Sequence, residues 1–210
     1  MIDSYITVAC GASSEISVQK SRFIGYVCPC ITEEYAQEYI RSIREKHRDA
    51  RHHCYAYIIG ENNGIMRYSD DGEPCGTAGM PIIDVLKKGK IVNCCVVVVR
   101  YFGGILLGTG GLVRAYTQSC KDAISAAGLV CMELSDCLRC RVTYQVWNQM
   151  QYLFLKKGFR LEEITYQDMI DFTVCARKRD TAAVTESIVN ISEGKAEWLA
   201  SEEKYIPWSI

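Results

Sequence analysis

The sequence lacks long hydrophobic runs and any strong net charge. Its longest apolar run, Cys94–Val99, is far shorter than the ~18 residues that cross a bilayer. The N-terminus has no basic stretch followed by an apolar one, so it does not resemble a secretory signal. The formal net charge is −1, and residues 1–128 carry 14 Lys and Arg against 13 Asp and Glu. We therefore expect a cytoplasmic protein without a membrane partner and without a bulk basic surface for nucleic acid.

Proline and histidine are also scarce, with four and three residues, whereas cysteine is abundant, with 12. Without an export signal, we expect these cysteines to be reduced thiols that act as small apolar residues. Cys137 and Cys140 have the spacing of a metal site, but strand alternation places them on opposite faces. Cys28 and Cys30 have no companion ligands. The cysteines therefore predict no metal site, and we assign no metal ligands and expect no cofactor.

Hydrophobic periodicity predicts both helices and strands in the first half of the chain. Thr32 is placed to cap a helix that ends near residue 48, with its charged face in solvent. Gly128 is placed to end another helix. The predicted strands are residues 13–30, His53–Gly60, Ile65–Tyr68 after a turn at residues 62–64, and Cys94–Val99, the last buried on both faces. The other predicted helices are Thr77–Lys88 and Thr109–Ala127. The residues predicted to be buried on the first and last helices are Tyr35, Ala36, Tyr39, Ile40, Ile43, Val113, Tyr116, Cys120, Ile124 and Ala127.

The second half predicts the order strand, helix, strand, strand, helix, strand, which is the ferredoxin-like unit. Its predicted elements are residues 137–144, 146–157, 160–166, 169–176, 181–192 and 196–205. The helices are expected to bury Val146, Met150, Leu153, Phe154, Val184, Ile188 and Ile191. We therefore predict an α+β protein with an α/β domain over residues 1–130 and a ferredoxin-like domain over residues 131–210. The second half contains no histidine and no cluster that suggests catalysis.

An acidic loop within Ser69–Pro81 is the first candidate for chemistry. Three carboxylates within four positions are costly unless solvent, a metal or an Arg neutralises them. Glycines then open a helix, where free backbone N–H groups can hold an anion. We expect a rigid, shaped functional loop rather than a plain acidic turn. Its candidate residues are Asp70, Asp71, Glu73, Gly76, Thr77 and Gly79.

A glycine-rich loop within Arg100–Tyr116 is the second candidate. It follows a buried strand and precedes a helix, an arrangement that presents backbone donors to phosphate. It matches neither of the common nucleotide-binding glycine motifs. Arg100 is either an anion ligand or the structural counter-ion of the acidic loop. The glycines either hold an anion or only permit close packing of the helix on the sheet. The candidate residues are Arg100, Gly103, Gly104, Gly108, Gly110, Gly111 and Arg114.

A histidine pair begins the strand after residue 51. Strand alternation places His53, Tyr55 and Tyr57 on one face and His52 on the other. If exposed, the His–Tyr–Tyr row would stack nucleobases. A structural role for the two histidines is the alternative, because no Ser or Cys has a matching nucleophile signature.

These three segments resemble the IMPACT/YigZ family, also called uncharacterised protein family 0029. The resemblance lies in His52-His53, in Ser69–Pro74 with Gly76–Gly79, and in Val96–Gly104 with Gly108–Tyr116; it spans roughly residues 15–128. It implies a first domain like ribosomal protein S5 domain 2 and a second like the last domain of the translocase elongation factor G. It also implies a ribosome or RNA partner. Eukaryotic relatives act in translational control through an added N-terminal domain, which we expect this chain to lack.

The leading hypothesis is a non-enzymatic protein that binds RNA or the ribosome and modulates translation. Arg100, Arg114 and the backbone of Gly103–Gly111 would bind phosphate, and His53, Tyr55 and Tyr57 would contact bases. The rival hypothesis is a small-molecule or metal-assisted hydrolytic enzyme that uses Asp70, Asp71 and Glu73 with His52 or His53. A third is a protein-interaction module with structural loops. The sequence does not indicate an oligomeric state.

Overall fold

The computed structural model describes residues 3–62 and 64–209. Within them, the chain is an α+β protein with five α-helices and two five-stranded sheets, which confirms the predicted class. The described residues divide into two compact units. The first contains the residues through Met132 and those from Pro207 onward, and the second is Glu133–Ile206.

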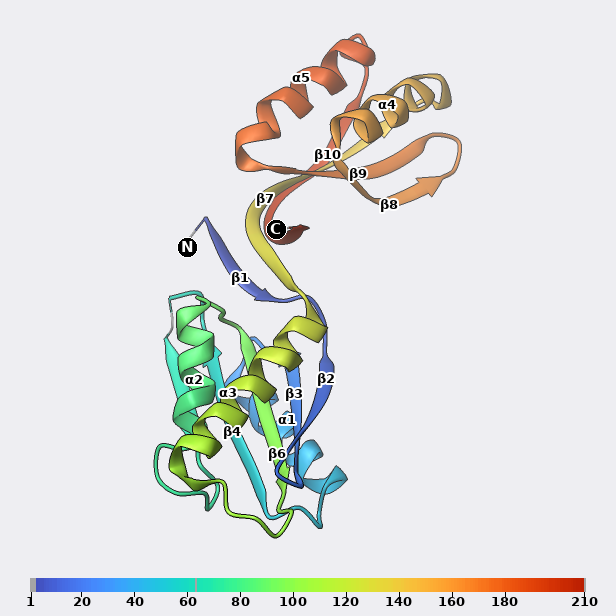
Figure 1. Cartoon of the computed structure of the whole chain (residues 1–210). Helices are drawn as coiled ribbons and strands as arrows, with labels where there is room; N and C mark the ends of the chain where they lie inside the picture. The colour runs from blue at the N-terminus through green and yellow to red at the C-terminus, as the bar shows by residue number, and fades with distance from the viewer. Residues whose placement is uncertain (1–2, 63, 210) are drawn as a thin grey trace. The chain divides into compact units, whose positions relative to one another are not determined.

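The first unit is built on an antiparallel sheet with a helical layer on each face (Figure 1). Helices α2 (Gly79–Lys88) and α3 (Gly108–Ala127) cover one face, and α1 (Glu33–Lys46) covers the other. The sheet order is β2 (Ala12–Val18), β3 (Ser21–Pro29), β6 (Cys94–Tyr101), β4 (His52–Ile59) and β5 (Ile65–Ser69). The central position of β6 explains why Cys94–Val99 is apolar on both faces.

Three local features of the sequence set this arrangement. The Thr32 hydroxyl accepts from the backbone N–H of Tyr35 at 3.2 Å and caps α1 as predicted. Gly128, with φ of 70°, ends α3. At Gly25, α3 packs so closely on β3 that a Cβ atom would lie 2.5 Å from the Ser119 carbonyl oxygen.

Some predictions of buried residues and of helix boundaries are wrong. Val113 is 37% exposed and Leu112 is buried instead, because the apolar stripe of α3 lies one residue to its side. Tyr35 is 50% exposed, and in the second unit Trp147 replaces the predicted Leu153 in the buried set of its helix. Helix α2 begins at Gly79 rather than at residue 77. Of the predicted turn at residues 62–64, the middle residue lies outside the described part of the chain.

The second unit has the order β7 (Leu129–Val142), α4 (Tyr144–Lys157), β8 (Arg160–Tyr166), β9 (Ile170–Arg177), α5 (Thr181–Ile191) and β10 (Glu197–Ser209). A short 3-10 turn, Lys178–Asp180, precedes α5. Strand β7 pairs with β9 and with β10, and β9 pairs with β8. Strand β1 (Ser4–Val8) belongs to the first unit. Both helices pack on one face of this sheet, where one apolar cluster joins them to β7 and β9.

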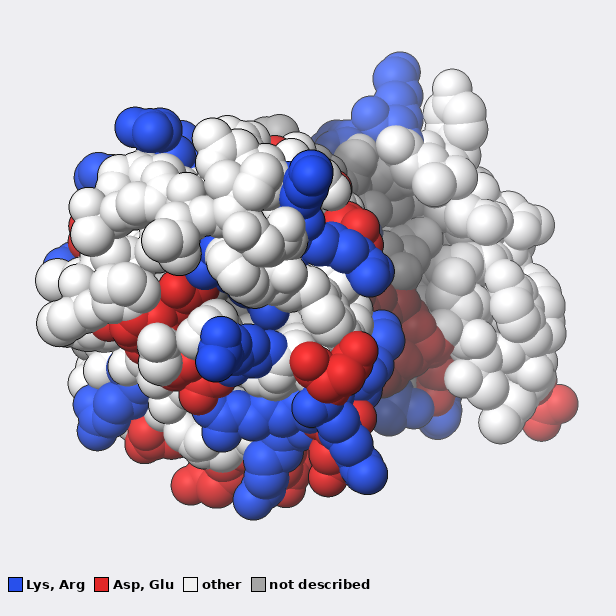
Figure 2. Space-filling view, turned by 60° about the horizontal axis from the view of Figure 1, so that its bottom comes forward, with Lys and Arg blue, Asp and Glu red and all other residues white. Residues whose placement is uncertain are grey.

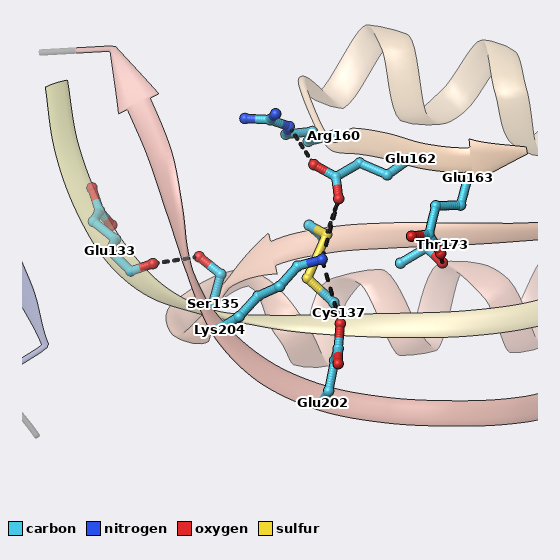
Figure 3. The surroundings of a disulfide bond; sticks show 10 residues. Glu133, Ser135, Cys137, Arg160, Glu162, Glu163, Thr173, Glu202 and Lys204 are labelled. Atoms are coloured by element: carbon cyan, nitrogen blue, oxygen red, sulfur yellow. Dashed lines mark hydrogen bonds and ion pairs between the residues drawn. A yellow bond between two sulfur atoms is a disulfide. The ribbon is translucent and has the colours of Figure 1, made fainter. Parts of the chain in front are cut away.

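The expectation that all cysteines are free thiols is wrong for one pair. Cys137 and Cys175 lie directly opposite each other on β7 and β9 and form a disulfide. The sequence did not indicate this pair, because the partners are separated by 38 residues. Figure 3 shows the bond beside the ion pairs of Lys204 with Glu162 and Glu202. Cys140 is a free, buried thiol, so no C-x-x-C metal site forms.

Candidate functional site

The candidate residues of the first unit lie where three strands meet at one end of the sheet. Arg100, near the end of β6, is opposite His52 at the start of β4. Tyr101 is opposite Arg22 at the start of β3. The acidic loop leaves the end of β5, and the glycine-rich loop leaves the end of β6. The sheet register therefore brings both loops to one end of the molecule's first unit.

In the acidic loop, the Asp70 carboxylate occupies the position at the start of α2 where the sequence predicts a bound anion. Its carboxylate accepts from the backbone N–H groups of Gly76 at 2.8 Å, Ala78 at 3.0 Å and Gly79 at 2.8 Å. These amides open α2, where a negative charge is favoured. Thr77 instead donates its hydroxyl to the Pro74 carbonyl at 2.7 Å. The backbone donors expected to bind an external anion are therefore used within the loop.

Asp71 ties the acidic loop to β4 and α1. One carboxylate oxygen accepts from Arg44 at 2.8 Å, and the other accepts from the backbone N–H of His53 at 2.7 Å. The Asp71 carbonyl accepts from Nδ1 of His52 at 2.9 Å. Because a carbonyl oxygen only accepts hydrogen bonds, Nδ1 of His52 carries the proton. The other ring nitrogen, Nε2, takes no part in this hydrogen bond.

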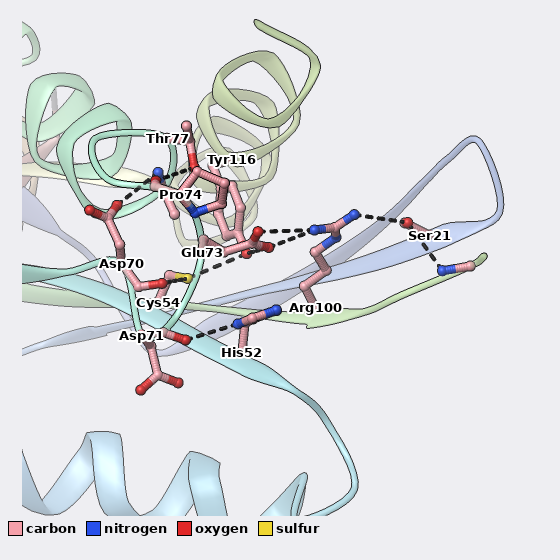
Figure 4. Close-up of polar contacts among 12 residues, drawn as sticks. Ser21, His52, Cys54, Asp70, Asp71, Glu73, Pro74, Thr77, Arg100 and Tyr116 are labelled. Carbon is pink, nitrogen blue, oxygen red and sulfur yellow. Dashed lines mark hydrogen bonds and ion pairs between the residues drawn. The ribbon is translucent and has the colours of Figure 1, made fainter. Parts of the chain in front are cut away.

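Glu73 and Arg100 form a buried ion pair between the two loops (Figure 4). Nη1 of Arg100 lies 2.7 and 3.0 Å from the two Glu73 oxygens, and the side chains are 6% and 3% exposed. Tyr116 of α3 donates to Glu73 at 2.8 Å. Burial, together with Cys54 and Glu73, raises the pKa of Tyr116, so its hydroxyl stays a neutral donor. Of the two roles predicted for Arg100, the structure supports the counter-ion role.

The glycines of the second loop form three groups. At Gly103 a Cβ atom would lie 2.0 Å from the backbone of Lys20, so this glycine permits close packing. Gly104 and Gly108 have φ of 84° and 68°, and a Cβ atom added at either would meet no other atom within 4 Å, so they shape the loop toward solvent. Gly110 and Gly111 lie in the first turn of α3, which has no acidic residue and no side-chain cap.

Both loops line one cavity of about 370 Å³, which we call the loop cavity. Arg100 and His52 line this cavity, whereas Asp70 and Arg114 do not. Arg114 and Gly111 line a separate hollow. Its lining residues are Arg51, His52, Glu73, Pro74, Arg100, Phe102, Leu106, Leu107, Gly108, Thr109 and Leu112. The structure thus brings the two loops together but separates the two arginines that we expected to act jointly.

The predicted exposed aromatic row on β4 is not exposed. His53 and Tyr57 are 7% and 0% exposed, because α1 covers this face of the sheet. The Tyr57 hydroxyl donates to Glu33 at 2.6 Å and accepts from Gln37 at 3.0 Å. Tyr55 stacks on Tyr57, with ring centroids 6.1 Å apart. Strand alternation correctly grouped these side chains, but they belong to the core beneath α1.

The metal-assisted alternative loses its expected ligands. Each of the three carboxylates accepts from a different protein donor. Asp70 accepts from the Gly76 amide, Asp71 from the His53 amide and Glu73 from the Arg100 guanidinium. Within the described residues, no group of three or more His, Cys, Asp or Glu side chains converges as a metal site would require. The acidic loop is therefore a structural element that holds β4, α2 and α3 together.

Two features of this end were missed in the sequence. The first is a basic segment, residues 41–51, which runs from α1 into β4 and holds five Lys or Arg against two acids. The sequence pattern places only the charges of Arg41–Glu45 on a solvated helix face. The second is the exposed apolar tip of the glycine-rich loop, where Phe102 and Leu106 are 45% and 86% exposed. A count of charges over residues 41–51 would have indicated the basic segment. The apolar residues Phe102 and Leu106 beside the glycines would have indicated the exposed tip.

Other surfaces carry fewer of the predicted residues. A larger hollow of about 920 Å³ lies between α2 and α3, and Gly76 is its one predicted site residue. No helix in the described part of the chain is both long and apolar enough to span a membrane.

Comparison with known proteins places these loops in a family. The sequence model described as the Impact N-terminal domain matches residues 19–124, which include the whole lining of the loop cavity. The IMPACT family member YvyE of Bacillus subtilis is 38% identical over 100% of this chain and 97% of its own length. The chain belongs to the IMPACT family.

Further IMPACT relatives differ in how much of the chain they match. The family member YigZ of Escherichia coli is 32% identical over 96% of this chain and 100% of its own length. Protein IMPACT of Mus musculus is 31% identical over 44% of this chain and 30% of its own length. A solved structure titled as that of a hypothetical protein has a TM-score of 0.61, with 30% identity over 95% of this chain and 98% of its own. The resemblance noted in the sequence is confirmed.

Proposed function

We propose that this IMPACT-family protein binds RNA or the ribosome and thereby modulates translation, without catalysing a reaction. The observation that carries the proposal is the set of exposed basic side chains around the glycine-rich loop. Figure 2 looks at the end of the first unit that carries the loops, where Lys and Arg side chains lie among acidic and uncharged ones. A local patch of this kind is what a near-neutral protein needs in order to bind a polyanion.

Several of these cations have no competing carboxylate. Lys20, Arg48 and Arg51 are exposed, and none of them forms an ion pair within residues 3–62 and 64–209. Lys46 lies 4.8 Å from the centre of the Tyr26 ring. Arg22, in contrast, pairs with Glu15 at 2.7 Å. The unpaired cations are available to replace the counterions of a phosphate backbone, and each such contact adds to the salt dependence of binding.

The exposed tip of the glycine-rich loop supplies a second type of contact. Phe102 projects beside Arg100, whose guanidinium carbon lies 5.5 Å from the ring centre. Leu106 is the more exposed of the two apolar residues at the tip. Single-stranded RNA is bound through bases that stack on aromatic and arginine surfaces, in addition to phosphate contacts. Phe102 thus takes over the role that we had assigned to Tyr55 and Tyr57.

The proposed fold types agree with this role. We propose an S5 domain 2-like first domain, residues 1–130, and a ferredoxin-like second domain, residues 131–210. In the second unit, β10, β7, β9 and β8 are neighbours in that order, with both helices on one face. The last, first, third and second strands of a βαββαβ chain therefore lie side by side, which supports the ferredoxin-like assignment. The resemblance of both domain types to translation proteins supports a ribosomal partner.

Salt-dependent binding of the full chain tests the proposal. The probes are a fluorescent 20-nucleotide single-stranded RNA and bacterial 70S ribosomes, the first followed by anisotropy and the second by co-sedimentation. We expect Arg51→Glu and Arg48→Glu each to weaken RNA binding about tenfold, and each to lower the slope of log affinity against log salt by about one. Complete absence of binding at low salt would falsify the proposal.

A charge-matched control separates a local surface from a general charge effect. Lys121→Glu makes the same charge change on α3, about 20 Å along the helix from its start. We expect this variant to bind almost as well as the wild type. Equal loss in Lys121→Glu and Arg51→Glu would show that the loop end is not the binding surface.

A further inference from the structure

We propose that the loop cavity binds a terminal nucleotide that carries a phosphomonoester, with the phosphate at the start of α3 and the base against Phe102. The inference rests on the proposed RNA binding and names the part of the RNA that this site takes. At about 370 Å³, the cavity is at the small end of ligand pockets, which are roughly 300–1,000 Å³. It is therefore suited to one nucleotide rather than to a continuous strand.

The cavity is electropositive although it contains a carboxylate. Glu73 is the one acidic residue in its lining, and both of its oxygens accept from Arg100. The positive end of α3 adds to the charge of Arg51, because the first turn, with Gly108 and Thr109, has no acid and no side-chain cap. An anion that enters the cavity therefore meets net positive charge.

Arg100 fixes one wall of the cavity. The residue is 5% exposed, yet its Nε atom is buried and makes no hydrogen bond within the described chain. A buried donor without a partner is costly, and native proteins satisfy nearly all such groups. Its guanidinium is held in place by Glu73 on one side and by Ser21 at 3.3 Å on the other. Arg100 is therefore a fixed part of the cavity wall, and it shares its charge with Glu73.

His52 adds a directed polar atom. Its Nδ1 donates to the Asp71 carbonyl, which fixes the ring and leaves Nε2 as the atom available to a ligand (Figure 4). A protonated ring would donate from Nε2 to phosphate, and a neutral ring would accept from a ribose hydroxyl. Both interactions fit a nucleotide, whereas neither fits a purely apolar ligand.

The remaining walls favour a base next to a terminal phosphate. Phe102, Leu106 and Leu107 make the apolar side, on which a base can stack. A phosphomonoester offers three unsubstituted oxygens to the donors of α3, Arg51 and His52, whereas an internal diester offers two. A chain end is therefore expected to bind more tightly than an internal nucleotide.

The test compares one RNA oligonucleotide in three forms: with a 5′-phosphate, with a 3′-phosphate, and with hydroxyls at both ends. Anisotropy competition with the full wild-type chain gives the affinity of each form, and adenosine 5′-monophosphate and inorganic phosphate are titrated as small competitors. We expect one phosphorylated form to bind at least tenfold more tightly than the hydroxyl form. We also expect the mononucleotide to compete more strongly than inorganic phosphate.

Two variants locate the effect in the cavity. Thr109→Asp places a carboxylate at the start of α3 and is expected to abolish the preference for phosphorylated ends. Gln118→Asp adds the same charge to α3 outside the cavity lining and is expected to retain the preference. Equal affinity for all three RNA forms would overturn this inference while leaving the proposed RNA binding intact. Loss of the preference in Gln118→Asp, or equal competition by inorganic phosphate, would also overturn it.

Discussion

The acidic loop and the glycine-rich loop are alike in sequence but use their backbone amides in opposite ways. In the acidic loop, Asp70 lies within hydrogen-bond distance of the amides of Gly76, Ala78 and Gly79 and fills the start of α2. In the glycine-rich loop, the start of α3 has neither an acid nor a cap. A glycine-rich helix start is therefore a candidate anion site only where the loop does not bring its own carboxylate.

The same difference applies to the charged side chains of the two loops. The acidic loop has its carboxylates neutralised internally, by Arg44 for Asp71 and by Arg100 for Glu73. The glycine-rich loop is surrounded by exposed cations such as Arg51 that have no such partner among the described residues. We infer that the first loop is a scaffold and that the second is the surface which meets a ligand. Four experiments test this division.

The largest effect is expected at the ion pair that joins the loops. Arg100→Met leaves Glu73 buried without its counter-ion, and we expect a loss of about 3–5 kcal/mol in the free energy of unfolding, measured with urea. Arg22→Met, which breaks the exposed pair with Glu15, is the control and should change stability little. Similar stability of the two variants would contradict the scaffold role of the acidic loop.

The glycines of the second loop provide the next test. Gly103→Ala forces a Cβ atom into the backbone of Lys20, and we expect it to cost about 3 kcal/mol. Gly104→Ala meets no neighbour but has a positive φ, and we expect it to cost about 1–2 kcal/mol. Thermal unfolding of both variants measures the difference. If Gly104→Ala were the more damaging, Gly104 rather than Gly103 would be the packing residue.

Much of the fold could be predicted because local patterns determine it. The unbroken apolar run Cys94–Val99 indicated a central strand, and Thr32 and Gly128 marked helix ends through their own hydrogen-bonding and backbone properties. The resemblance of the loop motifs indicated the family. Each of these signals lies within a short stretch of sequence.

The parts that were missed depend on partners distant in the chain. Alternation showed that His53 and Tyr57 share a face, but it did not show that α1 covers that face. The role of Arg100 depended on Glu73, which is 27 residues away. Disulfide formation by Cys137 depended on strand register with β9. Local patterns predict which residues belong together, whereas the choice of neighbour is a tertiary property.

Removal of Asp70 should have a smaller effect than Arg100→Met or Gly103→Ala. Asp70→Ala leaves three backbone N–H groups at the start of α2 without their acceptor, and we expect a loss of about 2 kcal/mol in the free energy of unfolding. Addition of 100 mM sulfate, which can occupy the vacated position, should restore part of this loss in the variant beyond its effect on the wild type. No difference in the sulfate response would mean that these amides do not form an anion position.

The smallest expected effect has the opposite sign and completes the comparison. Thr109→Asp supplies the start of α3 with the acid that α2 already has in Asp70, so we expect the free energy of unfolding to rise by about 0.5 kcal/mol, measured with urea at low salt. Thr109→Asn, a substitution without charge, is the control and should give a smaller gain. A loss of stability in Thr109→Asp would mean that the start of α3 is already electrostatically satisfied, and the contrast between the two loops would then fail. A gain confirms that the partial positive charge at the start of α3 has no compensating negative group in the folded chain. Such an arrangement costs stability, and it is expected where a helix start binds an anionic ligand.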